Sequence, residues 1–214
     1  MKNLKILSMN LGRRFVPFKD KGKRQYLMDF IKEEDYDIIM LQGNALTSNI
    51  NFSKMDYNAI AYYNRMALLY NRNLQVCDTD FKSKVASATV ICDKDPIVCI
   101  NVNCESSNRI EDVFNVCYDY SSINNAHAFA TRIVAGRFPK EVDINEFCDV
   151  FNLDDISTLV GQESYIENDR EMLNHFFISR NLEALNVHKL VGMTEVSKIG
   201  EAYPIEVTLK KVLK

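Results

Sequence analysis

The chain has 214 residues, of which 47% are apolar, with only seven glycines and four prolines. This size and composition predict one domain spanning residues 1–214, with a large buried core. The formal net charge of −3 and the isoelectric point of about 5.7 argue against sequence-independent coating of nucleic acid, which needs a basic surface. No stretch approaches the roughly 20 apolar residues that a membrane-spanning helix needs.

The cysteines and the N-terminus indicate the compartment. None of the six cysteines forms a Cys-x-x-Cys pair, and three lie in strand-like apolar runs, where a reduced thiol behaves as a small apolar group. The first residues lack the apolar stretch and cleavage site of a signal peptide. We therefore expect reduced thiols in a cytoplasmic protein and no zinc site.

The first half of the chain predicts short strands and one helix. Residues 4–10 form an apolar run typical of a buried strand, and residues 25–31 place two apolar pairs on one face of a helix. The near-continuous apolar run at 36–41 indicates a central strand covered on both faces. Polar turns separate five further strands, which are expected at 59–63, 66–70, 74–78, 86–92 and 97–103.

The second half of the chain mixes helices and strands. A helix is expected over 109–120, because Val113, Val116, Cys117 and Tyr120 share one face. The elements expected after it are a strand at 131–138, a short helix at 144–151, and strands at 175–179, 184–190 and 205–209. Runs of strands interrupted by helices predict an α+β protein with two packed sheets and flanking helices.

Five motifs mark the ends of these strands. They are Leu4–Asn10, Asp37–Gly43, Arg132–Pro139, Asn174–Ser179 and Gly200–Ile205. In this order and spacing they resemble the endonuclease/exonuclease/phosphatase superfamily, the DNase I-like metal-dependent phosphoesterases. The resemblance runs nearly end to end and implies a four-layer α/β/β/α sandwich of two mostly antiparallel sheets. The strand ends that should converge on one edge of that sandwich are Asn10, Gln42, Asn103 and Arg137.

The positions that would supply the chemistry have changed. Phosphodiester hydrolysis needs a metal held by carboxylates and a base near the attacking water. In the superfamily these groups come from an asparagine, a glutamate after Leu-Gln, a histidine, a Gly-Asp-Phe-Asn turn, another aspartate and a closing Ser-Asp-His. The corresponding residues here are Asn10, which matches, Glu201, which keeps only the charge, and Gly43, Asn103, Arg137, Asn174 and Ala202.

These replacements predict a site without a metal, without a cofactor and without a catalytic residue. The nearest polar neighbours are Asn44, Glu105 and Glu195, and they do not restore a carboxylate cluster. The alternative is a divergent metal-dependent phosphodiesterase, nuclease or phosphatase whose ligands for Mg²⁺ have moved elsewhere in the chain.

Arg137 stands where the superfamily has an aspartate. A guanidinium does not bind a metal ion, but its donors fit a phosphate group. Arg137 is therefore expected either to pair with Glu201 in a redundant pocket or to hold a phosphate without hydrolysing it. Arg13 and Arg14 begin a run of six cations within twelve residues. That run either attracts a phosphate or an acidic partner, or forms a solvated face.

The sequence thus predicts a catalytically degenerate phosphoesterase-fold protein, a pseudoenzyme that binds a protein partner or a phosphate-bearing ligand. A structural subunit whose old cleft is filled is a further hypothesis. An open polar cleft beside Asn10 would favour ligand binding, and a filled cleft would favour the structural role.

Overall fold

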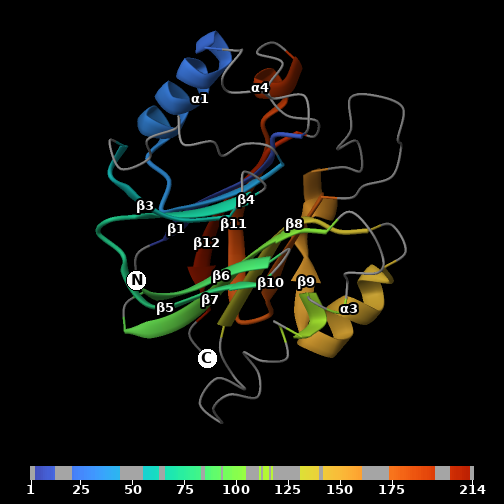
Figure 1. Cartoon of the computed structure of the whole chain (residues 1–214). Helices are drawn as coiled ribbons and strands as arrows, with labels where there is room; N and C mark the ends of the chain where they lie inside the picture. The colour runs from blue at the N-terminus through green and yellow to red at the C-terminus, as the bar shows by residue number, and fades with distance from the viewer. Residues whose placement is uncertain are drawn as a thin grey trace.

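A computed structural model shows two β-sheets that face each other, with helices on their outer sides (Figure 1). It describes residues 3–12, 21–43, 55–62, 66–82, 85–92, 94–104, 111, 113–115, 117, 131–139, 142–160, 174–195 and 203–212. Arg13, Arg14, Glu201 and Ala202, which the sequence analysis singled out, lie outside these residues. Among the helices of the described part, none has the length and apolar character needed to cross a membrane.

The first sheet has six strands around one parallel pair. In spatial order the strands are β11 (Leu182–Lys189), β12 (Ile205–Lys211), β1 (Leu4–Asn10), β2 (Ile38–Gln42), β4 (Met66–Asn71) and β3 (Tyr57–Tyr62). The strands β1 and β2 run parallel, and the other four pairings are antiparallel. Because β1 and β2 are parallel, their carboxyl ends, Asn10 and Gln42, lie side by side in the register.

The second sheet repeats this plan. Its strands in spatial order are β5 (Gln75–Lys82), β6 (Val85–Cys92), β7 (Asp95–Asn103), β8 (Thr131–Arg137), β10 (Asn174–Ser179) and β9 (Leu153–Asp155). Here β7 and β8 form the parallel pair, and the other four pairings are antiparallel. The expected sandwich of two mostly antiparallel sheets is confirmed.

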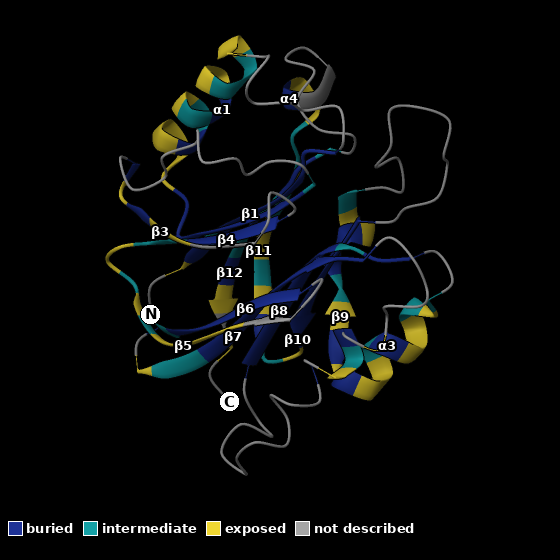
Figure 2. Ribbon diagram, viewed as in Figure 1, coloured by how far each residue is buried: buried dark blue, intermediate teal, exposed yellow. Residues whose placement is uncertain are grey.

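Helices cover the outer face of each sheet. The helix α1 (Lys21–Glu34) buries Leu27 and Ile31 against the first sheet, where Met193 of α4 (Val191–Glu195) also packs. The helix α3 (Ile144–Phe151) buries Phe147 and Phe151 against the second sheet. These contacts complete the four layers, and Figure 2 shows the buried strands between the more exposed helices.

Several elements differ from their expected bounds. The helix expected at 25–31 begins at Lys21, so three of the six clustered cations lie in its first turn rather than in a loop. Of the helix expected at 109–120, the described residues 111, 113–115 and 117 are helical. The short elements β9, η3 (Ile156–Val160) and α4 were not expected, because they lack a long periodic pattern.

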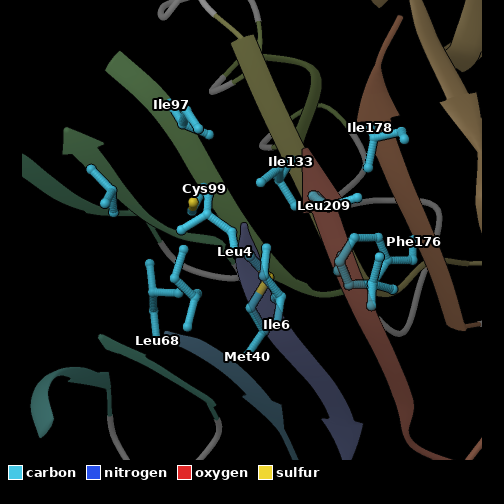
Figure 3. Close-up of a cluster of buried hydrophobic side chains, with 14 of the residues drawn as sticks. Leu4, Ile6, Met40, Leu68, Ile97, Cys99, Ile133, Phe176, Ile178 and Leu209 are labelled. Carbon is cyan, nitrogen blue, oxygen red and sulfur yellow. The ribbon is translucent and has the colours of Figure 1, made fainter. Parts of the chain in front are cut away.

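The core between the sheets is apolar over most of its length. Figure 3 shows Leu4, Ile6 and Met40 of the first sheet facing Ile133 and Phe176 of the second. Every second residue of a strand points to the same side, which identifies the residues that face the other sheet. Toward one edge of the sandwich these inward residues become polar. On β7 the inward residues run Ile97, Cys99, Asn101 and Asn103, and on β1 they run Leu4, Ile6, Ser8 and Asn10.

Gly136 permits a close approach between β7 and β8. Its φ is +132°, and a Cβ built on it would lie 2.0 Å from the carbonyl oxygen of Val102. A side chain at this position would therefore strain the backbone and push the two parallel strands apart. Gly136 thus meets a backbone requirement of the β7–β8 pair, and it directly precedes Arg137.

We expect Gly136→Ala to lower the free energy of unfolding by about 2–4 kcal/mol, because it adds both backbone strain and overpacking. Urea unfolding followed by circular dichroism measures the change. The matched control is Gly22→Ala in α1, where nothing lies within 4 Å of the added Cβ. The control should match the wild type or exceed it by up to about 1 kcal/mol. Wild-type stability of Gly136→Ala would contradict this description of the β7–β8 contact.

Candidate functional site

The strand ends named in the sequence analysis meet at one edge of the sandwich. In the second sheet, Arg137 lies between Asn103 of β7 and Asn174 of β10 in the register. In the first sheet, Asn10 lies beside Gln42. Side-chain hydrogen bonds join the two groups across the core. We call this set the polar rim, and its members are Asn10, Gln42, Asn101, Asn103, Arg137 and Asn174.

Asn101 makes the most extensive contacts of the polar rim. Its Nδ2 donates to the carbonyl oxygens of Leu41, at 3.0 Å, and Ala67, at 2.7 Å, both in the first sheet. Its Oδ1 accepts a 2.8 Å hydrogen bond from Nε2 of Gln42. One side chain of the second sheet therefore binds three groups of the first, and it is fully buried.

Asn10 makes the second connection between the sheets. Its Oδ1 accepts from the backbone N–H of Gly12 at 2.9 Å, which closes the turn after β1. Its Nδ2 donates to Oδ1 of Asn174 at 3.3 Å. The one residue that matches the superfamily pattern thus acts here as a turn-forming and bridging side chain.

Backbone groups determine which way these carboxamides point. The N–H of Gly12 can only donate, so it selects Oδ1 of Asn10 and turns Nδ2 toward Asn174, which must present its oxygen. The carbonyls of Leu41 and Ala67 can only accept, so they select Nδ2 of Asn101.

This orientation of the carboxamides leaves two polar atoms without a hydrogen-bond partner among the described residues. Because Asn101 presents its oxygen to Gln42, Gln42 must present Nε2, and its Oε1 faces elsewhere. Gln42 Oε1 and Asn174 Nδ2 are both buried and have no hydrogen-bond partner among the described residues. Among its carboxamides, the polar rim therefore retains one unused acceptor and one unused donor.

Gly43 occupies the position of the expected metal-binding glutamate and has no room for one. Its φ is +91°, in a region that L-residues rarely adopt. A Cβ there would lie 2.5 Å from the nitrogen and 2.8 Å from the oxygen of Gly12. Both neighbours are backbone atoms, which cannot swing aside as a flexible side chain can. A side chain at this position would therefore require the backbone at Gly12 or Gly43 to move.

Comparisons with solved structures establish the fold. The catalytic domain of human Nocturnin matches with a TM-score of 0.74 and 12% identity, over 98% of this chain and 95% of that one. An endonuclease/exonuclease/phosphatase family protein from Bacteroides thetaiotaomicron matches with a TM-score of 0.69 and 14% identity, over 99% of both chains. The chain has the endonuclease/exonuclease/phosphatase fold.

Further comparisons agree with this assignment. The mannosyl-6-phosphatase Bt3783 of Bacteroides thetaiotaomicron VPI-5482 has the same fold, with a TM-score of 0.69 and 12% identity over 97% of this chain and 99% of that one. The sequence itself matches no family model and no curated protein. At these identities the likeness concerns the architecture, so the chemistry must be argued from the polar rim.

The polar rim does not fit the divalent metal that the resemblance implies. Mg²⁺ prefers carboxylate oxygens and near-octahedral geometry. The described rim residues offer five neutral carboxamides and one guanidinium, and Asn10 and Asn101 already use their oxygens as acceptors. No group of three or more His, Cys, Asp or Glu side chains close enough to hold a metal occurs within the described ranges.

Arg137 gives the rim its charge. It is half-buried, while the five carboxamides around it are buried and neutral. Its expected partner Glu201 lies outside the described residues, so the predicted ion pair stays a prediction. The described rim therefore combines one cation with five neutral carboxamides.

His175 lies on the face of β10 that points away from the polar rim. Its Nδ1 lies 2.8 Å from Oδ2 of Asp155, whose other oxygen accepts from the backbone N–H and hydroxyl of Ser157. The imidazole stacks on Phe177 with ring centroids 5.4 Å apart, and its edge meets Phe138. It therefore supports the packing of the second sheet and does not take part in the rim.

Two of the fully buried cysteines are poor nucleophiles. All six are reduced thiols. Burial raises the pKa of Cys99 and of Cys117 to about 12, so both thiols stay protonated at neutral pH. Cys99 lies in the apolar core between the sheets.

Sequence reasoning missed Asn101 and gave Gln42 no role in the site. The available signal was the alternation on β7, where apolar and amide residues succeed one another on the same face. Gly12 was also missed, and its part in excluding a side chain at Gly43 depends on a contact across the turn.

We expect Asn101→Asp to lower the free energy of unfolding by about 3–5 kcal/mol at pH 7, because it places a carboxylate against two carbonyl oxygens. Folding should raise the pKa of the introduced carboxyl group above the value of about 3.9 that an aspartate has in an unfolded chain. The unfolded state then binds fewer protons, so the loss of stability grows as the pH rises above about 4.

Urea unfolding of this variant at pH 5 and pH 8, relative to the wild type, measures both effects. The matched control is Asn145→Asp, an exposed position in the first turn of α3, which should change stability by less than about 0.5 kcal/mol. A loss of stability that does not depend on pH would show that residue 101 does not face the carbonyls as described.

Proposed function

We propose that this protein has lost metal-dependent hydrolysis and acts by binding a ligand at the polar rim. The observation that carries the proposal is the contact between Gly43 and Gly12, because it removes the space in which a metal-binding glutamate would stand. A neighbouring residue could compensate for the replacement of a single carboxylate. Here, however, the backbone at Gly12 and Gly43 would have to move before any side chain fits at position 43.

The carboxamides support the same proposal. Hydrolysis of a phosphoester needs a Lewis acid or an activated water and a group that accepts a proton. Carboxamides do not ionise near neutral pH, and those of Asn10, Gln42 and Asn101 are engaged in hydrogen bonds across the sheets. Their hydrogen bonds connect the two sheets, and among the described rim residues they leave no group that would activate water.

The charge of the described rim indicates the class of ligand. The described rim residues are one guanidinium, that of Arg137, and neutral carboxamides, a composition that suits a ligand with negative charge better than a divalent cation. A phosphate-bearing ligand meets this requirement and agrees with the solved structures of the same fold, one of which is named a sugar phosphatase. Binding without turnover is therefore the activity that the described geometry supports best.

An assay of hydrolysis tests this proposal. The purified protein should not cleave bis-p-nitrophenyl phosphate or p-nitrophenyl phosphate faster than metal-containing buffer does, with Mg²⁺, Mn²⁺, Ca²⁺ or Zn²⁺ at millimolar concentration. Release of p-nitrophenolate measures the rate.

The contradicting result is metal-dependent cleavage that disappears in Asn10→Ala and persists in Arg180→Gln. Arg180 is half-exposed and pairs with Asp149 and Asp154, away from the rim, so it controls for the loss of a polar side chain. Such cleavage would establish the alternative, a divergent phosphoesterase whose metal ligands come from other parts of the chain.

A further inference from the structure

Two atoms of the polar rim need a partner that bulk solvent does not supply. Oε1 of Gln42 can only accept, Nδ2 of Asn174 can only donate, and neither has a hydrogen-bond partner among the described residues. Gln42 is 0% exposed and Asn174 is 6% exposed, and both atoms are shielded from solvent. Leaving such groups unpaired costs free energy, which a partner enclosed between the sheets would recover.

The amides cannot turn to satisfy these two atoms. The N–H of Gly12 selects Oδ1 of Asn10, and Nδ2 of Asn10 then requires the oxygen of Asn174. In the same way Asn101 presents its oxygen to Gln42, which must therefore present Nε2. The unused acceptor and the unused donor are thus fixed by the hydrogen bonds around them.

Ser8 adds a third polar group with unused capacity. Nε2 of Gln42 has two protons, which Oδ1 of Asn101, at 2.8 Å, and the carbonyl oxygen of Met40, at 3.0 Å, accept. Oγ of Ser8 lies 3.4 Å from the same nitrogen, too far for more than a weak contact. Ser8 is buried, and its hydroxyl proton has no acceptor among the described residues.

The three groups lie around Asn10. Ser8 comes two residues before Asn10 on the inward face of β1. Gln42 is the neighbour of Asn10 in the register of β1 and β2, and Asn174 accepts its hydrogen bond from β10. Two donors and one acceptor without strong partners therefore meet on three neighbouring or facing strands.

Short side chains lie beside these groups. The strands β1 and β8 approach each other across the core, and their inward residues here include Ser8 and Ala135. Serine and alanine fill less of the space between the sheets than the leucines and isoleucines that line it elsewhere. An enclosed space lined by polar atoms holds water, whereas an apolar one of similar size stays dry.

We infer that one water molecule is enclosed between the sheets at this place and belongs to the polar rim. It accepts from Nδ2 of Asn174 and Oγ of Ser8 and donates to Oε1 of Gln42. Three hydrogen bonds are the usual number for a buried water. This water joins β1 and β2 to β10, a third connection between the sheets beside those of Asn101 and Asn10. It is expected whether or not the protein hydrolyses phosphoesters.

Neutron diffraction from crystals grown in D₂O tests the site, because deuterium positions show the orientation of the water and of each amide directly. We expect one D₂O molecule whose oxygen lies roughly 2.6–3.2 Å from each of the three atoms, with a deuterium directed at Oε1 of Gln42. Absence of this water, or a direct hydrogen bond between Gln42 and Asn174, would overturn the inference. An ion with oxygen ligands at about 2.0–2.2 Å would overturn the proposed function as well.

Oxygen-17 magnetic relaxation dispersion, which counts long-lived internal waters, tests the same site in solution. Ser8→Val removes the hydroxyl and places methyl groups in the space beside it, so this variant should hold one long-lived water fewer than the wild type. The matched control is Ser87→Val, because Ser87 is a buried serine of β6 whose hydroxyl donates to the carbonyl oxygen of Asp80. The control should keep the wild-type number.

Equal numbers of long-lived waters in the wild type and in folded Ser8→Val, or an equal loss in Ser87→Val, would overturn the inference. Circular dichroism shows whether each variant is folded. If Ser8→Val does not fold, the neutron structure of the wild type decides.

Discussion

The side chain of Asn101 joins the two sheets, and the arrangement of the polar rim depends on it. Its amide nitrogen donates to backbone carbonyls of β2 and β4, and its oxygen accepts from Gln42. Backbone acceptors fix the amide in one orientation, and that orientation is passed on to Gln42. A buried polar group in a core costs free energy unless it is bonded, so these bonds hold the sheets at one spacing along the polar edge.

The turn at Gly12 has a comparable effect on the chemistry of the rim. Its N–H orients Asn10, and its backbone fills the space that a side chain at Gly43 would need. The neutral amides of the rim are buried, whereas Arg137 is half-buried. In the described part of the chain, the rim of this fold therefore holds carboxamides and a guanidinium and no carboxylate.

Much of the fold follows from local patterns. The apolar run at 4–10, the strand-like segment at 97–103 and the short helix expected at 144–151 predict β1, β7 and α3, and α3 has the bounds expected for it. The short β9 and α4 do not follow, because tertiary packing rather than propensity stabilises elements of that length. The rim is predictable only in part. Strand ends identify Asn10 and Arg137, but the bond between Asn101 and Gln42 joins residues 59 positions apart and appears only in three dimensions.

The loss of the metal site is tested most directly by asking whether a divalent metal ion binds at the polar rim. Crystals soaked in millimolar MnCl₂ would reveal bound Mn²⁺ through its anomalous scattering. We expect no anomalous peak between the two sheets at the polar rim, because carboxamides held by backbone groups and a nearby guanidinium do not replace the hydration shell of the ion. An ordered Mn²⁺ coordinated by Asn10 and Glu201 would contradict it.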